Sequence, residues 1–177
     1  MKLAITGHSK GIGRAIADLY PNAVGFSRSN GYDISKPEDV RLIIETTVAE
    51  CDVFINNAYH DFAQCDLLEG IFQHWKEDPD KTIVNIISRA RYGLGKNKFY
   101  GQTKMELYNK AKSMMFGGKQ CRIININPGY VKTDMASHVP DSVTMLTPEQ
   151  LASMIKWCLD QPQGIEIGEL SVWRTAL

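Results

Sequence analysis

The stretch that most constrains the fold covers residues 1–20, where a strand pattern, a glycine-rich turn and a helical pattern follow one another. Strand-forming residues occupy Lys2–Thr6, and apolar residues then recur at helical spacing at Ile12, Ile16 and Leu19. Between them, glycines let the backbone N–H groups and the positive end of a helix dipole face an anion. The stretch therefore predicts a dinucleotide-binding unit, against the alternative of an ordinary tight turn.

Three glycines in this turn have separate roles. Gly7 lets the chain turn sharply off the strand, Gly11 lets a phosphate approach the backbone, and Gly13 lets the helix lie close to the sheet. We therefore expect the pyrophosphate of a dinucleotide at this turn.

Strand and helix patterns alternate along the rest of the chain. Strands are expected at Ala23–Ser27, Val53–Asn56, Ile83–Ile87, Arg122–Asn127 and Ile165–Trp173, and helices at Pro37–Ala49, 62–77, 99–116 and 147–160. Ser35 and Glu38 form a predicted capping box for the second helix, and Thr147 with Gln150 forms one for the last. This alternation predicts an α/β fold: a Rossmann-type, doubly wound parallel sheet in three layers, forming a single domain over residues 1–177.

The tip of the second strand carries the signal for cofactor choice. Ser27, Arg28 and Ser29 follow one another there without an acidic residue, and Lys10 precedes the second glycine. A guanidinium beside hydroxyls suits a phosphate, whereas an acidic residue would bind ribose hydroxyls. NADP(H) is therefore favoured over NAD(H), unless Arg28 and Lys10 are ordinary surface cations.

A tyrosine and a lysine four residues apart carry the expected chemistry. Tyr100 and Lys104 share a helix face, and a nearby ammonium lowers a tyrosine pKa, so the phenol could pass a proton to a carbonyl oxygen. The spacing is weak by itself, since it also occurs at Tyr32/Lys36, Tyr92/Lys96 and Tyr108/Lys112. Only the Tyr100 pair begins a helix that follows a serine, Ser88, at a strand end. Ser88 could bond the same carbonyl oxygen, or simply cap a turn.

These motifs together resemble the short-chain dehydrogenase/reductase family. Five occur in the family's order: Thr6-Gly7-x-x-x-Gly11-Ile12-Gly13; Asp33-Ile34; Asn56-Asn57-Ala58; Ser88 with Tyr100-x-x-x-Lys104; and Pro128-Gly129-Tyr130-Val131-x-Thr133. Each is weak or moderate alone, but five in order cover residues 6–133.

The resemblance implies a role for each matched residue. Ser88, Tyr100 and Lys104 would be catalytic, with Tyr100 as the general acid/base and Lys104 also bound to the nicotinamide ribose. The cofactor would also contact Gly7, Ser9, Lys10, Gly11, Ile12, Gly13, Arg28, Asp33, Ile34, Asn57, Ala58, Pro128, Gly129, Val131 and Thr133. Family members commonly dimerise through helices that correspond to 62–77 and 99–116, so a homodimer is possible.

Four departures from the family pattern stand out. Only four residues separate Arg28 from Asp33, so the sheet lacks an edge strand or keeps a remnant at Gly31–Ile34. Residues 58–80 hold no asparagine, so the family's catalytic asparagine, which supports a water-linked proton relay, has no counterpart. Tyr59 replaces a usual glycine and would narrow the mouth of the site. The substrate loop near 135–146 is short, which favours a small or loosely held substrate.

Charge and composition exclude several other classes. The 20 basic and 20 acidic residues balance, which argues against a general nucleic-acid or anionic-membrane surface. No apolar run approaches a membrane span, and the first residues already read as a strand rather than a signal peptide. Four scattered cysteines indicate reduced thiols in a cytoplasmic protein, and four histidines without metal spacing indicate no metal.

The sequence thus predicts a minimal NADP(H)-dependent carbonyl reductase, which moves hydride between nicotinamide C4 and a small carbonyl or alcohol substrate. One alternative is a redox sensor that binds NADP(H) without catalysis, which the missing asparagine favours and the Ser88, Tyr100 and Lys104 set opposes. Another is a nucleotide-sugar epimerase or dehydratase, which would need a further substrate domain.

Overall fold

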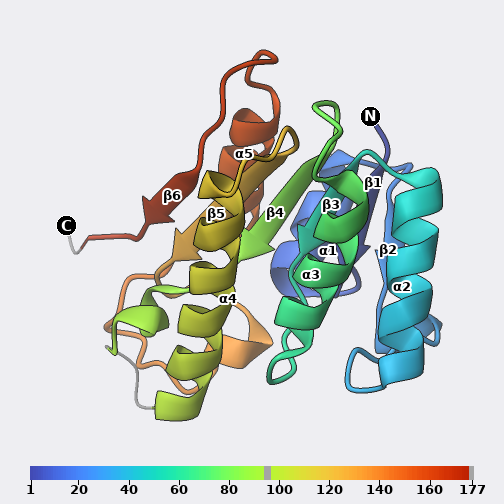
Figure 1. Cartoon of the computed structure of the whole chain (residues 1–177). Helices are drawn as coiled ribbons and strands as arrows, with labels where there is room; N and C mark the ends of the chain where they lie inside the picture. The colour runs from blue at the N-terminus through green and yellow to red at the C-terminus, as the bar shows by residue number, and fades with distance from the viewer. Residues whose placement is uncertain (94–96, 176–177) are drawn as a thin grey trace.

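The computed structural model describes residues 1–93 and 97–175. Lys96 of the Tyr92/Lys96 pair therefore lies outside the described residues. Figure 1 shows a twisted sheet with helices α2, α3 and α4 on the face toward the viewer and α1 and α5 behind it. The predicted α/β fold with a doubly wound sheet in three layers is confirmed.

All neighbouring strands of the sheet run parallel, in the order β2-β1-β3-β4-β5-β6. The strands are β1 Leu3–Thr6, β2 Val24–Phe26, β3 Val53–Asn56, β4 Thr82–Ile86, β5 Arg122–Pro128 and β6 Glu169–Val172. The α-helices are α1 Gly11–Leu19, α2 Pro37–Glu50, α3 Ala63–Trp75, α4 Lys98–Phe116 and α5 Pro148–Leu159, and short 3-10 turns are η1 Arg28–Asn30, η2 Arg89–Tyr92 and η3 Asp134–Ala136. The predicted elements are all present, although β6 is shorter than the predicted Ile165–Trp173.

The core lies on both faces of the sheet because side chains of a strand alternate between faces. In β1, Leu3 and Ile5 pack toward α1 and α5, whereas Ala4 packs toward α2, α3 and α4. Strands that are buried on both faces therefore appear in the sequence as continuous runs of apolar residues. This packing fixes the strand ends, and thus the loops that carry the candidate site.

The segment after β2 explains the short spacing in the sequence. Residues 28–30 form η1, Gly31 has a φ of 93°, and residues 31–36 continue in turns to α2. In the part of the chain that the structure describes, β2 therefore ends the sheet on this side. The expected loss of an edge strand is confirmed, and the alternative of a strand remnant at Gly31–Ile34 is wrong.

The two predicted helix caps have different outcomes. Thr147 accepts a hydrogen bond from the Gln150 N–H, and the Gln150 side chain accepts from the Thr147 N–H, so this capping box is confirmed. The Ser35 capping box is wrong, because Lys36 is the N-cap of α2 and its side chain makes no capping bond. Instead, the Ser35 N–H donates to the Asp33 carboxylate, which draws Ser35 into the preceding turn.

Within the described residues, no helix combines the length and apolar character needed to cross a membrane. All four cysteines are buried thiols. No group of three or more His, Cys, Asp or Glu side chains is placed to hold a metal in this described part of the chain.

Candidate active site

The loops that follow β1 and β3 are joined by hydrogen bonds. The Thr6 hydroxyl accepts from the Asn57 and Ala58 N–H groups at 2.9 and 3.0 Å, and the Asn57 amide donates to the Thr6 carbonyl at 2.9 Å. Gly7 has a φ of 71°, and a Cβ on Gly13 would lie 2.2 Å from the Gly7 carbonyl oxygen. The structure therefore brings together four residues that were predicted to bind the cofactor: Gly7, Gly13, Asn57 and Ala58. At position 13, in the first turn of α1, only glycine fits.

The loop after β5 meets the same glycine turn. A Cβ on Gly11 would lie 3.0 Å from the Thr133 methyl group, and the Lys10 ammonium lies 3.4 Å from the Asp134 carboxylate. Val131 is buried and pairs with Leu146 in an isolated parallel β-bridge. The turn is thus bordered by the β5 loop on one side, and Ile12, in the first turn of α1, packs against the core.

Pro128 and Gly129 lie where β5 ends beside β6. Pro128 is opposite Val172 in the ladder, and the Gly129 N–H donates to the Val172 carbonyl at 2.7 Å. A Cβ on Gly129 would lie 2.7 Å from the Trp173 Cβ, so this glycine lets the edge strand pass closely.

The residues expected at the adenosine end lie on the segment after β2. Arg28 begins η1, the Asp33 carboxylate accepts from the Ser35 N–H, and Ile34 packs against the core. The backbone bond from Ser35 lowers the pKa of Asp33. The Asp33 carboxylate bonds within its own turn, and Lys10 pairs with Asp134 of the loop after β5.

A hollow of about 500 Å³ lies between the glycine turn, α1 and the tip of β2. It is lined by His8, Ser9, Arg14, Ala17, Asp18, Pro21 and Ser29. Arg14 was missed by the sequence reasoning. Its signal is a cation in the first turn of the helix that follows the glycines, although it also pairs with Asp18 at 2.7 Å.

Ser88, Tyr100 and Lys104 converge at the carboxyl end of β4. Ser88 follows the strand, and its hydroxyl accepts from the Ala90 N–H at 3.1 Å. Asn97 caps α4 by accepting from the Tyr100 N–H, which places Tyr100 in the first helical turn. The Lys104 ammonium lies one turn further, 5.5 Å from the centre of the Tyr100 ring. The four-residue spacing therefore correctly predicted that Tyr100 and Lys104 lie on the same face of α4.

The protonation of this site differs from the sequence expectation. Burial raises the pKa of Tyr100, and the Ser88 hydroxyl opposes that rise. Burial also lowers the pKa of Lys104 to about 7. The expected lowering of the Tyr100 pKa by Lys104 is therefore wrong for this geometry, because desolvation dominates and the amine is itself only partly charged at neutral pH.

Two further side chains complete the site. The Tyr59 ring packs edge-on against Tyr100 with centroids 4.8 Å apart, and its centre lies 5.4 Å from the Lys104 ammonium. Gln64 accepts a hydrogen bond from that ammonium at 2.5 Å. Sequence reasoning noted Tyr59 but missed Gln64, whose only signal is a polar residue near the start of a helix.

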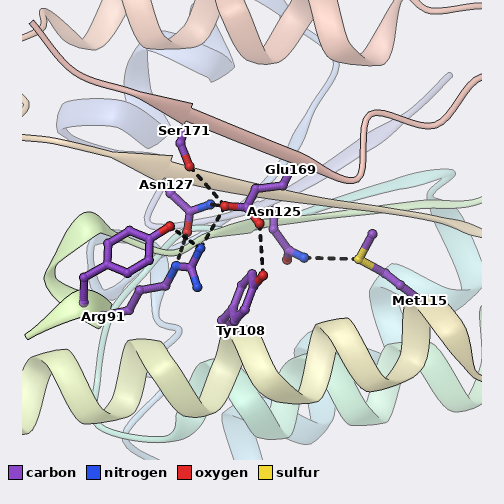
Figure 2. A network of polar contacts seen from close by, with 8 residues as sticks. Arg91, Tyr108, Met115, Asn125, Asn127, Glu169 and Ser171 are labelled. Atoms are coloured by element: carbon purple, nitrogen blue, oxygen red, sulfur yellow. Dashed lines mark hydrogen bonds and ion pairs between the residues drawn. The ribbon is translucent and has the colours of Figure 1, made fainter.

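A polar network holds the segment that follows Ser88 (Figure 2). Arg91 in η2 donates to the Asn127 amide oxygen at 3.0 Å and to the Glu169 carboxylate at 2.8 Å, and its guanidinium lies 3.5 Å from the centre of the Tyr108 ring. Glu169 also accepts from the Tyr108 hydroxyl and from Ser171. The network thus joins η2 and α4 to strands β5 and β6.

Comparisons with known proteins identify the fold. No protein-family model matches this chain, and no curated protein matches its sequence. Among solved structures, it resembles an alcohol dehydrogenase from the archaeon Thermococcus sibiricus complexed with 5-hydroxy-NADP, with a TM-score of 0.81 and 18% identity over 98% of this chain and 96% of that chain.

Two other solved structures give the same result. A 3-alpha-hydroxysteroid dehydrogenase from Pseudomonas sp. B-0831 complexed with NADH has a TM-score of 0.80 and 17% identity, covering 97% of this chain and 95% of that chain. A serine dehydrogenase complexed with NADP+ has a TM-score of 0.79 and 17% identity, covering 98% and 95%. The chain therefore has the fold of the short-chain dehydrogenases/reductases, a name that another similar solved structure carries, as the order of its sequence motifs predicted.

Proposed function

We propose that the protein is an oxidoreductase that interconverts a carbonyl and an alcohol, with NADP(H) as the hydride carrier. The observation that carries this proposal is the convergence of Ser88, Tyr100 and Lys104 at one strand end, on the edge of the sheet that also carries the glycine turn. The similar solved structures are dehydrogenases by name, and several are complexed with nicotinamide cofactors.

The residues of the turn fit a dinucleotide. Positive φ angles at Gly7 and Gly11 and the tight contact at Gly13 leave the helix start without side chains that would block a phosphate. When bound, the cofactor would supply hydride chemistry at its nicotinamide ring. Pro128, Gly129, Val131 and Thr133 would hold that end, and Asn57 and Ala58 the adenosine ribose.

Cationic and hydroxyl groups favour the phosphorylated cofactor. Arg28 follows β2, and the hollow beside it is lined by Ser9, Arg14 and Ser29. A guanidinium with hydroxyls provides a suitable site for a 2′-phosphate. NAD(H) remains the alternative, and Lys10 would have to leave Asp134 to assist.

Tyr100 would donate the proton in the direction of carbonyl reduction. Its raised pKa keeps the phenol protonated at neutral pH, which a general acid needs. Ser88 would donate a hydrogen bond to the same carbonyl oxygen, and Lys104 would stabilise the phenolate that forms. The short loop near 135–146 favours a small aldehyde or ketone as substrate.

The test is NADPH oxidation against a panel of aldehydes, ketones and quinones, with NADH in parallel. We expect turnover that prefers NADPH and that falls at least about 10²-fold in Tyr100→Phe. The control is Tyr20→Phe, because the Tyr20 hydroxyl makes no hydrogen bond among the described residues and Tyr20 lies at the end of α1 away from the glycine turn. NADPH binding without turnover across the panel would contradict the enzyme proposal and favour a redox sensor.

A further inference from the structure

We propose that Gln64 is a positioning residue for the reaction, which holds the Lys104 amine through a direct side-chain hydrogen bond. This inference rests on the proposed function, in which Lys104 assists proton transfer by Tyr100. The family resemblance assigns that neighbourhood an asparagine and a water-linked relay, whereas residues 58–80 of this chain contain no asparagine.

Lys104 is held by two oxygens from other elements of the fold. Its side chain is buried, and its ammonium donates to the Gln64 amide oxygen at 2.5 Å and to the Ile86 carbonyl at 2.8 Å. An ammonium has three N–H groups, so these two bonds leave one for the side on which Tyr100 lies. The two acceptors come from α3 and β4, so the position of the amine is fixed by elements outside its own helix.

The orientation of the Gln64 amide is fixed as well. Its NH₂ group donates to the Asn56 carbonyl at 2.7 Å and lies 3.4 Å from the Ile86 carbonyl. A flipped amide would set its oxygen against two carbonyl oxygens, which repel it. The amide oxygen must therefore face Lys104, where it acts as an acceptor.

A row of buried asparagines supports this arrangement. Asn56 donates to the Gln64 carbonyl at 2.8 Å and to Asn85 at 3.1 Å, and Asn85 donates to Asn125 at 3.2 Å. These three residues stand opposite one another on β3, β4 and β5. The Asn56 amide oxygen has no partner among the described residues, but its amide nitrogen bonds both Gln64 and Asn85, so the row ties the Gln64 main chain to the three strands.

The charge on Lys104 depends on these neutral oxygens. The titratable groups that face the amine are the Tyr59 and Tyr100 phenols and the Cys65 thiol, whose pKa is raised by burial to about 11. Among the described residues, the Lys104 ammonium donates its hydrogen bonds to the Gln64 and Ile86 oxygens, which carry no charge. Removing the Gln64 oxygen should make the ammonium less stable and lower its pKa further.

The experiment follows Lys104 directly by NMR, with lysine labelled by ¹³C at the ε position. Lys104→Met identifies its signal, and the titration midpoint is compared between the unaltered protein and Gln64→Met. We expect that midpoint to fall by at least about one pH unit, since the lost bond joins an amide to a charged group. The control Gln73→Met alters an exposed glutamine on the same helix and should leave the midpoint unchanged.

A second variant protects the test if Gln64→Met does not fold. Gln64→Asn keeps a side-chain amide but shortens the side chain by one methylene, which withdraws the oxygen from the amine, so the Lys104 midpoint should again fall. The pH profile of kcat/KM should move in the same direction as the midpoint. An unchanged midpoint in the folded variants would overturn the proposal for Gln64. Because the titration needs no turnover, it is independent of whether the enzyme proposal itself stands.

Discussion

Two buried cations lie in the elements that follow Ser88, Arg91 in η2 and Lys104 in α4, and they are held in different ways. Arg91 is 7% exposed and faces the Glu169 carboxylate, whereas Lys104 is 2% exposed and, among the described residues, donates its hydrogen bonds to neutral oxygens. A guanidinium stays charged at any ordinary pH, so its carboxylate partner is matched to a permanent charge. An amine without a counter-charge can lose its proton. The comparison therefore separates a cation that secures the fold from one that can take part in chemistry.

The largest effect is expected where the chemistry lies. Lys104→Met should lower kcat/KM for NADPH-dependent reduction by at least about 10²-fold, since Tyr100 loses its partner for proton transfer. The free energy of unfolding should change little, because removal of a poorly solvated amine offsets the loss of its bonds to Gln64 and Ile86. Urea unfolding beside the NADPH assay checks both. Retained turnover with a large loss of stability would reverse the roles given to the two cations.

Arg91→Met should show the opposite pattern. It leaves Glu169 and Asn127 without their partner, and we expect unfolding to become easier by about 2–3 kcal/mol, less than for a fully buried pair because Glu169 is partly exposed. Arg89→Met is the control, because Arg89 lies in the same turn and only stacks on Trp173 at 4.1 Å. Equal urea midpoints for the two variants would show that the network in Figure 2 does not secure the fold.

The pH dependence of stability gives a third test. The pKa of Lys104 is about 7 in the folded protein against an ordinary value of 10.5, so the unfolded state binds more protons between these values. Stability therefore rises with pH in this window, by up to about 1.4 kcal/mol per pH unit from this group. Subtracting the unfolding curve of Lys104→Met removes the other groups. A difference that falls or stays flat between pH 7 and 10 would contradict the lowered pKa.

The smallest effect is expected at an exposed cation. Lys10 pairs with Asp134 at 3.4 Å, but both side chains are more than 80% exposed. Lys10→Met should therefore change the free energy of unfolding by less than about 0.5 kcal/mol. The KM for NADPH should rise while that for NADH stays constant if Lys10 turns to the 2′-phosphate. An equal rise for both cofactors would place Lys10 outside cofactor choice.

The sequence by itself determined the fold class and the shared helix face of Tyr100 and Lys104. Strand and helix patterns are local, and four residues of helix place Tyr100 and Lys104 on one face whatever the rest of the chain does. The glycines of the first turn likewise indicate local backbone conformations with positive φ, which the φ angles of Gly7 and Gly11 confirm. Ser35 shows the limit even of local reading, because Asp33 competes for its N–H.

Only the tertiary structure decided the partners and protonation of the buried groups. Gln64 and Lys104 are 40 residues apart, and Arg91 and Glu169 are 78 apart, so no sequence spacing links either pair. The pKa values of Tyr100 and Lys104 depend on how far water is excluded, which is a property of the packed sheet and helices. Burial is the physical reason for this division, because it is set by contacts between segments that the chain brings together only on folding.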